Sequence, residues 1–387
     1  MEQRRFPGNS QWYHETQASL KSHAAPLFPE AAGIEDRFLL GLAQQYSDVL
    51  KPVLNHSQPA MLASRDLYQL LLPQQLTVSK THTLTIYDRL STALTVAQVT
   101  GIQRLCNHYA ARLNPLSGPD SSRESNRRLT QITEYARQLA SQPTLIDAAA
   151  LSRLDEVGLT APDIVSFHQL IGFVSYQARI VAGLNALLAL PVRWIPGVTL
   201  PEDAHAESFE HLTPWRSLLP PVELRYASAS QLEALTWCQP QETLRECAWL
   251  LAHDGHALYG WGSLLNVTEE ATAAEEGRLA AAVAARINGS PVCLDRYAQG
   301  ELREALFEGV DQALESATPQ QKAVIHCAAQ LTRSPERLSA AHLQPLKEAG
   351  YSDVAVFNII QSTALAGWNN RLMQALGSTA PLTDAED

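Results

Sequence analysis

The sequence predicts an all-α protein made of two related halves. Apolar residues recur at the three- and four-residue spacing of amphipathic helices along most of the chain, whereas strand-like alternation is confined to 84–87 and 222–225. Several residues of the first half also return at a constant distance in the second. The pairs, each 192 positions apart, are Leu139 and Leu331, Gly158 and Gly350, and Arg179 and Arg371. So long a period indicates a duplicated domain rather than a solenoid.

The first half contains four clear helical patterns, at 36–50, 83–99, 125–140 and 161–188. The first and third place their apolar residues along one stripe. The second follows Ser79 and Thr81, either of which can cap a helix. The fourth opens with Pro162 and Asp163, which helices favour in their first turn.

The second half repeats this pattern in further predicted helices, at 240–252, 275–287, 291–309, 319–331, 340–349 and 353–376. Between the halves, prolines and an acidic run discourage any continuous element. We therefore expect five parts: an N-terminal arm (1–35), a first helical domain (36–190), a linker (191–220), a second helical domain (221–377) and a polar tail (378–387).

Composition narrows the class of protein. The 387 residues are 45% hydrophobic and 18% charged, with a net charge of −11, which argues against binding to nucleic acid or to an anionic membrane. The first residues lack the apolar core of a signal peptide, and the longest apolar run, near 180–191, is too short to span a bilayer. The five cysteines are scattered and form no Cys-x-x-Cys motif. We expect a cytoplasmic protein without a structural zinc site or a nucleotide cofactor.

The sharpest local motif runs from 288 to 297. Gly289 can end one helix, Ser290 can cap the next, and Pro291 suits its first position. Cys293 then falls at the third helical residue, where backbone amides and the helix dipole favour a thiolate, and Tyr297 follows one turn later. The motif predicts either a reactive thiol of lowered pKa or a small side chain buried at a helix junction.

This arrangement of a helix, a glycine and a short cysteine motif with a ring four residues later resembles the alkylhydroperoxidase D / carboxymuconolactone decarboxylase superfamily. The segments 329–335, 346–353 and 368–371 are similar to its peroxidase-related branch, and the opening 11–16 and the double length resemble the YciW-type oxidoreductases of enteric bacteria. The resemblance covers about 80–188 and 240–377. It implies a tandem duplication of an alkylhydroperoxidase D-like helical domain and, since the family builds trimers and hexamers from such units, a homo-oligomer.

In thiol peroxidases of that family a Cys-x-x-Cys pair reduces a hydroperoxide, helped by a histidine and an upstream glutamate. By resemblance, the first cysteine falls on Ser290, the second on Cys293 and the histidine on Tyr297, while the glutamate falls near Arg278. A dithiol cycle needs a second thiol that can attack the oxidised first one, and serine cannot do this. The resemblance therefore implies a single-cysteine version of the chemistry.

The first copy departs further from the family pattern. Gly101 and Gly289 are 188 positions apart, and this offset places the two cysteine positions on Ile102 and Leu105 and the histidine position on Tyr109. His108 is one place out of register. The two tyrosines are either hydrogen-bond donors to an oxidant or aromatic core residues with satisfied hydroxyls.

Three functions follow as expectations. The first is a peroxidase-related oxidoreductase of peroxide or sulfur-compound metabolism. Cys293 is oxidised to a sulfenic acid and is then reduced by an external thiol or by Cys327. Its partner is a small-molecule substrate or a thiol reductant. The second is a non-catalytic binding or assembly protein that kept the fold. The third is a cysteine-independent decarboxylase-like lyase, which needs a polar pocket around Tyr109, His108 or His168.

Two weaker patterns complete the candidates. His253, Asp254 and His256 lie close enough in sequence to suggest a metal, but Gly255 favours a turn and no further ligand is evident, so no metal site is expected. Arg179 and Arg371 recur late in their helices, where they indicate either helix-end salt bridges or an anion contact.

Overall fold

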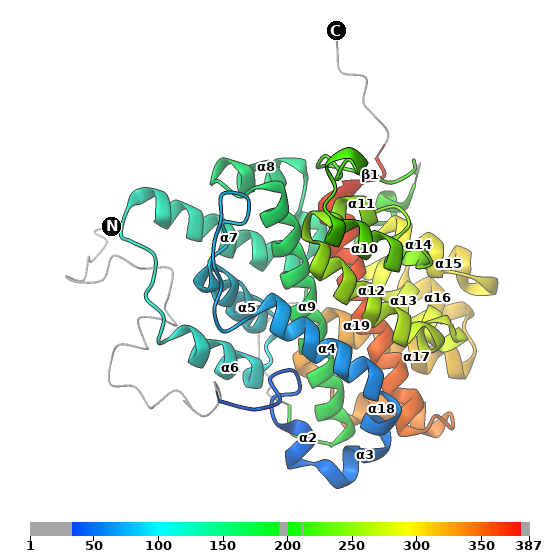
Figure 1. The fold of residues 1–387 in the computed structure, drawn as a ribbon. Helices are drawn as coiled ribbons and strands as arrows, with labels where there is room; N and C mark the ends of the chain where they lie inside the picture. The colour runs from blue at the N-terminus through cyan, green and yellow to red at the C-terminus, as the bar shows by residue number, and fades with distance from the viewer. Residues whose placement is uncertain (1–32, 193–199, 211–212, 381–387) are drawn as a thin grey trace, which may run out of the picture.

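The computed structural model describes residues 33–192, 200–210 and 213–380 and is almost entirely helical, which confirms the all-α prediction (Figure 1). Most of the predicted arm and tail, together with 193–199 and 211–212, lies outside the described residues. The elements of the first half, with 3₁₀ turns labelled η, are α2 (Leu42–Gln45), α3 (Ser47–His56), α4 (Gln58–Leu71), α5 (Ile86–Thr100), α6 (Gln103–Leu113), α7 (Arg123–Ser141), η2 (Pro143–Leu145), α8 (Ala148–Glu156) and α9 (Ala161–Leu187).

The second half follows with more short elements. They are η3 (Ala206–Phe209), β1 (Arg216–Ser217), η4 (Leu224–Tyr226), α10 (Ala229–Cys238), η5 (Glu242–Leu244), α11 (Ala248–Leu251), η6 (Ala252–Asp254), α12 (Gly255–Ala273), α13 (Glu275–Asn288), α14 (Pro291–Tyr297), η7 (Gly300–Leu302), α15 (Arg303–Glu308), α16 (Val310–Ser316), α17 (Pro319–Arg333), η8 (Pro335–Arg337), α18 (Ala340–Glu348), α19 (Asp353–Leu376) and β2 (Gly377–Ser378). β1 and β2 pair antiparallel and join the predicted linker to the end of α19.

The centre of the protein is the packing of α9 against α19, the most extensive contact between any two elements (Figure 1). A side chain at Gly172 would overlap the indole of Trp368, which itself stacks on Trp261 with ring centroids 3.9 Å apart. A side chain at Gly183 would overlap Ile360 in the same way. The two glycines therefore let the helices approach closely.

By length and composition alone, α9 could cross a membrane. However, 89% of its most apolar 18-residue stretch is buried inside the protein. This helix is longer than the apolar run recognised in the sequence. Burial on every side accounts for its composition, because a helix that is apolar all round is typical of a protein core.

Local capping signals set the starts of the central helices. α9 begins at Ala161 behind a capping box formed by Thr160 and Asp163, and α19 begins at Asp353 behind the cap Ser352, both as predicted. The limits of α7, α13, α17 and α18 also agree with the predicted ranges to within about two residues.

Other predictions were wrong in their details. The expected helix at 36–50 breaks at Tyr46 into α2 and α3, that at 240–252 becomes three short turns, and that at 291–309 ends at Tyr297. The expected strand at 84–87 is instead the start of α5, because a capping box between Thr85 and Asp88 satisfies the first amides; Ser79 and Thr81 do not cap it. The expected strand at 222–225 contains the start of η4. The helices not anticipated are α4, α6, α8, α10, α12 and α16.

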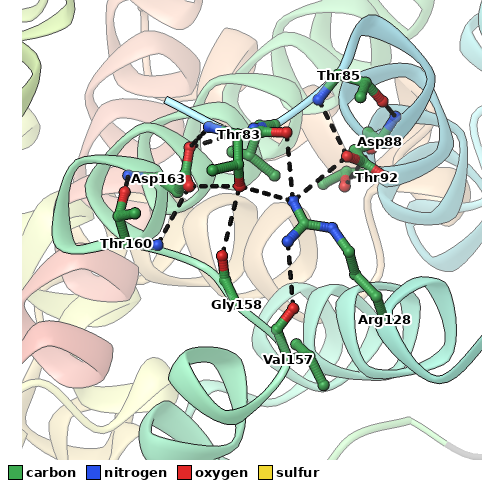
Figure 2. A network of polar contacts seen from close by, with 10 residues as sticks. Thr83, Thr85, Asp88, Thr92, Arg128, Val157, Gly158, Thr160 and Asp163 are labelled. Carbon is green, nitrogen blue, oxygen red and sulfur yellow. Dashed lines mark hydrogen bonds and ion pairs between the residues drawn. The ribbon is translucent and has the colours of Figure 1, made fainter. Parts of the chain in front are cut away.

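A buried carboxylate ties the segment before α5 to the start of α9 (Figure 2). Asp163 accepts hydrogen bonds from the amide and hydroxyl of Thr83, both at 2.7 Å, and from the amide of Thr160 at 3.1 Å. Arg128 of α7 donates to the Thr83 hydroxyl at 3.0 Å and lies 3.6 Å from the carboxylate of Asp88. The network therefore fixes three elements of the first half to one another.

Candidate functional site

The cysteine motif folds largely as its sequence suggests. Gly289 ends α13 in a left-handed conformation with φ of 77°, and Pro291 is the first residue of α14. Ser290 occupies the N-cap position, but its side chain makes no capping hydrogen bond, which corrects the expected role. Its hydroxyl instead lies near the thiol of Cys293, where it favours the anionic form of the sulfur.

Cys293 is fully buried, with no exposed surface. The amide nitrogen Nδ2 of Asn369, on α19, donates a hydrogen bond to its sulfur at 3.3 Å. Burial raises the pKa of the thiol, and this effect outweighs the opposing influence of Arg296, Ser290 and Asn370. The expected thiolate of lowered pKa is therefore wrong, because α14 places the sulfur inside the protein, where the charged form loses its hydration.

The sulfur is nonetheless surrounded by polar groups rather than by aliphatic side chains alone. Nδ2 of Asn288 donates to the side-chain oxygen Oδ1 of Asn370 at 3.1 Å. The side-chain oxygen of Asn369 is buried and has no hydrogen-bond partner among the described residues. Sequence reasoning missed this pair of asparagines as site residues, although two adjacent amides in a largely buried helix were a usable signal.

Tyr297 and Asn369 both line a cavity of about 260 Å³. Arg278 and Arg296 lie in the same wall, together with Glu242 and Glu269. Cys293 is not among the residues that line the cavity, and Asn369 connects the cavity wall to its sulfur. Burial raises the pKa of Tyr297, and the neighbouring Cys293 adds to that effect. The phenol is therefore a hydrogen-bond donor near neutral pH and not a base.

Other cysteines offer no exposed thiol near Cys293. Cys327, expected as a distant resolving partner, is fully buried in α17, and burial raises the pKa of its thiol to about 12. Cys247 is also buried, and burial raises the pKa of its thiol to about 12. The neighbouring Cys293 adds to that effect. Neither thiol can act as a nucleophile near neutrality without local opening.

The equivalent residues of the first half form no matching site. Ile102 is the N-cap of α6, and Leu105 is fully buried where Cys293 stands in the second half. Tyr109 donates to the side-chain oxygen of Gln177, which confirms a buried tyrosine with a satisfied hydroxyl. His108 belongs to a different contact, a hydrogen bond of 2.6 Å between its Nε2 and the hydroxyl of Tyr68.

His168 is fully buried and makes two hydrogen bonds of 2.6 Å, from Nδ1 to the carbonyl of Ile164 and between Nε2 and the hydroxyl of Tyr135. A neutral imidazole satisfies both contacts, because it donates through Nδ1 and accepts through Nε2. Burial lowers the pKa of His168 to about 4. The residue therefore acts as a core hydrogen-bonding group and does not meet His108 or Tyr109 in one pocket.

The histidine-rich motif at 253–256 serves the fold. Nε2 of His253 bonds the carbonyl of Pro220 at 2.8 Å. Asp254 caps α12 through the amide of Ala257 at 3.0 Å and accepts a hydrogen bond from the hydroxyl of Ser166 at 2.5 Å. Within the described residues, no group of three or more histidine, cysteine or acidic side chains is placed to hold a metal.

The recurring arginines make neither helix-end salt bridges nor an exposed anion contact. Arg179 donates to the carbonyl of Thr332 at 2.9 Å, and Arg371 donates to the carbonyl of Ala140 at 2.7 Å. Both side chains are almost fully buried, and each reaches from a central helix to the end of a helix in the other half. Their role is to join the halves.

Comparison of the chain with protein-family models, with curated proteins and with solved structures finds no match. The residues Cys293, Asn369 and Tyr297 combine a buried thiol, an amide in contact with it and a cavity that the same asparagine lines.

Proposed function

We propose that the protein is a peroxidase-related oxidoreductase in which Cys293 is the redox group and the cavity beside Tyr297 receives the oxidant. One observation carries the proposal: Asn369 lines the cavity and also donates a hydrogen bond to the sulfur of Cys293. A peroxide in the cavity would then meet a residue that is itself in contact with the sulfur.

The chemistry needs one thiol and an external reductant. The sulfur of Cys293 attacks one peroxide oxygen, the O–O bond breaks, and the products are a cysteine sulfenic acid and an alcohol or water. A first external thiol condenses with the sulfenic acid and releases water, and a second displaces the protein thiol and leaves as a disulfide. Tyr297 orients the oxidant by donating a hydrogen bond.

The test is peroxide consumption by the full chain with dithiothreitol as reductant. Cys293→Ser is expected to abolish turnover and the trapping of a sulfenic acid at residue 293 by dimedone, read by mass spectrometry. Cys327→Ser, an equally buried cysteine on another helix, is the matched control and is expected to retain both. Equal activity in wild type and Cys293→Ser would exclude the proposal.

A second candidate function is favoured by the same burial. A sulfur with no exposed surface and a raised pKa suits a binding or assembly protein that kept the fold without the chemistry. On this alternative Cys293→Ala unfolds at the same temperature within a few degrees and no substrate is turned over. Dimedone labelling of the wild type then stays at the level of the Cys293→Ala variant.

We also infer that the two halves arose by duplication of one helical unit, as the resemblance implies. The positions of the elements support this inference. The first and last residues of η8 follow those of η2 by 192 positions, and the same holds for α18 and α8. Gly158 and Gly350 are both left-handed, with φ of 85° and 91°. A chain that pairs two such units resembles a covalent dimer, and we propose that it assembles further into a homo-oligomer, which analytical ultracentrifugation tests directly.

A further inference from the structure

A second group of polar side chains lies in the first half, away from Cys293. The hydroxyl of Tyr68, on α4, receives a hydrogen bond from Nη1 of Arg112 at 2.6 Å and lies 2.6 Å from Nε2 of His108. Tyr68 and His108 are almost fully buried. Both partners of the phenol come from α6, so one helix holds the tyrosine oxygen from two sides.

This tyrosine also lines a cavity of about 520 Å³. Ile34 and Pro73, which are only half-buried, contribute apolar surface to the wall, and Arg37 contributes a guanidinium. Arg37 is close enough to Tyr68 to lower the pKa of the phenol, as Arg112 also does, although burial raises it by more. The cavity therefore has a cationic and hydrogen-bonding side next to an apolar one.

The charges around the cavity are not equally available. Arg65 is neutralised by Asp36 through two hydrogen bonds of 3.1 and 2.8 Å. Glu35 is exposed, so solvent screens its charge. The guanidinium of Arg37 makes no ion pair or hydrogen bond to any residue that the structure describes, which leaves it as the cation available to a ligand.

The hydrogen bonds at Tyr68 have two possible directions. Arginine can only donate, so the tyrosine oxygen accepts from Arg112. The phenol proton then points either to Nε2 of His108 or, when His108 donates through Nε2, towards a ligand oxygen. A bound anion selects the second arrangement, because it offers an acceptor near two cations.

We propose that this cavity is a binding site for a small organic carboxylate, whose charged group contacts Arg37 and the hydroxyl of Tyr68 and whose apolar body packs on Ile34 and Pro73. The combination of an available guanidinium, a supported phenol and an apolar wall is typical of sites that recognise one anionic group on a hydrophobic molecule. His108 acts as a positioning residue for the phenol. This site is independent of the redox proposal for Cys293.

The experiment is calorimetric titration of the full chain with cyclohexanecarboxylate, and with cyclohexanecarboxamide as the uncharged probe. The carboxylate is expected to bind, and the amide to bind about tenfold more weakly or worse, because charge-assisted hydrogen bonds are the stronger ones. Arg37→Gln is expected to weaken carboxylate binding by about tenfold. Both ligands are transparent in the near ultraviolet, so a difference spectrum of the Tyr68 phenol, absent in Tyr68→Phe, reports the contact directly.

Controls separate binding from folding. Tyr68→Phe leaves buried partners of the phenol unsatisfied and could destabilise the protein, whereas Arg37 is only half-buried, so Arg37→Gln carries the test if the first variant fails to fold. The exposed Arg127→Gln and the distant Cys293→Ser are expected to bind as the wild type does. Equal affinity for acid and amide, unchanged affinity in Arg37→Gln, or no carboxylate binding up to about 10 mM would each overturn the proposal.

Discussion

Arg179 and Arg371 make equivalent contacts across the two halves of the chain. Each donates through Nη1 to the carbonyl four residues before it and through Nη2 to a carbonyl of the other half. The two acceptors, Thr332 and Ala140, are separated by 192 positions, as the arginines themselves are. Two buried guanidinium groups thus join the ends of α7 and α17 to the central helices.

Removing either arginine is expected to destabilise the protein. Arg371→Met leaves the carbonyls of Leu139 and Ala140 without these donors and should lower the free energy of unfolding by about 2–4 kcal/mol. Arg371→Lys should recover little of this loss, because an ammonium cannot reproduce the fork. Urea unfolding measures the effect, with the exposed Arg127→Met as control at about 0.5 kcal/mol or less.

The double variant tests whether the two guanidiniums repel each other. Arg179 lowers the pKa of Arg371, as expected for two cations in one buried region. Either single variant removes the whole repulsion between the two charges, and the double variant gains nothing further from it. The sum of the two single losses therefore includes this gain twice, whereas the double variant includes it once. Arg179→Met with Arg371→Met should therefore cost more than the sum of the single losses. A strictly additive result would show that the two charges do not interact.

Close packing of α9 on α19 makes Gly172 intolerant of a methyl group. Gly172→Ala should lower the free energy of unfolding by about 1–3 kcal/mol, because the indole of Trp368 is held by Trp261 and by a 3.1 Å hydrogen bond to Gln169. Gly260→Ala is the control, since the methyl group would meet the aliphatic side chains of Leu67 and Leu70 rather than a ring that is held in place. The double variant with Gly172→Ala and Trp368→Leu should lose less free energy of unfolding than the two single variants lose together.

His168 should make stability fall in mild acid. Its pKa is about 4 in the folded protein, below its ordinary value, because burial disfavours the imidazolium. As the pH falls from about 6.5 to about 4, the unfolded chain binds a proton that the folded protein does not, so the free energy of unfolding decreases by up to about 3 kcal/mol. Above about pH 6.5 both states are neutral at this residue and the effect disappears.

The measurement is urea unfolding across that pH range. His168→Gln should remove this part of the slope, whereas the exposed His326→Gln should keep it. An unchanged slope in His168→Gln would mean that the histidine is not held neutral by its surroundings.

Asp163 should contribute more to stability than an ordinary capping residue. Asp163→Asn replaces one carboxylate oxygen with an NH₂ group that faces the donors of Thr83 and Thr160, and it should cost about 2–3 kcal/mol (Figure 2). Asp147→Asn, a change at the exposed cap of α8, should cost about 1 kcal/mol or less. Hydrogen exchange of the Thr83 amide should accelerate only in the first variant.

Oxidation of Cys293 should rise with pH without reaching a plateau near neutrality. The folded pKa of this thiol is raised, so the reactive thiolate stays a minor species below the ordinary thiol value of about 8.5. The rate of dimedone trapping should therefore grow about tenfold per pH unit between about pH 6.5 and 8.5. A plateau below about pH 7 would contradict the raised pKa.

Much of the helical architecture was predictable because its signals are local. Pro162 and Asp163 mark the start of α9, and Gly289 and Pro291 mark the junction before α14, through backbone hydrogen bonds that span only a few residues. The missed helices range from the short α16 to the 19-residue α12, whereas the wrongly joined ones break where the chain turns, as at Tyr46 and after Tyr297. There, tertiary contacts decide whether a helix continues.

The environment of the cysteine was not predictable in this way. A thiol at the third residue of a helix is expected to ionise easily, and sequence alone places Cys293 there. Its burial depends on α19, whose Asn369 is 76 positions further along the chain. The same holds for Tyr68 and His108, which are 40 positions apart and come from different helices.

By itself the sequence determined the helical class, the starts of α9, α13, α17 and α19 and the 192-residue spacing, since each follows from neighbouring residues or from direct repetition. Only the tertiary structure decided that the thiol is a weak acid, that the arginines bind carbonyls of the opposite half and that Tyr68 borders a cavity. These properties depend on which distant groups exclude water or supply hydrogen bonds, and solvation and long-range contact are not encoded in local spacing.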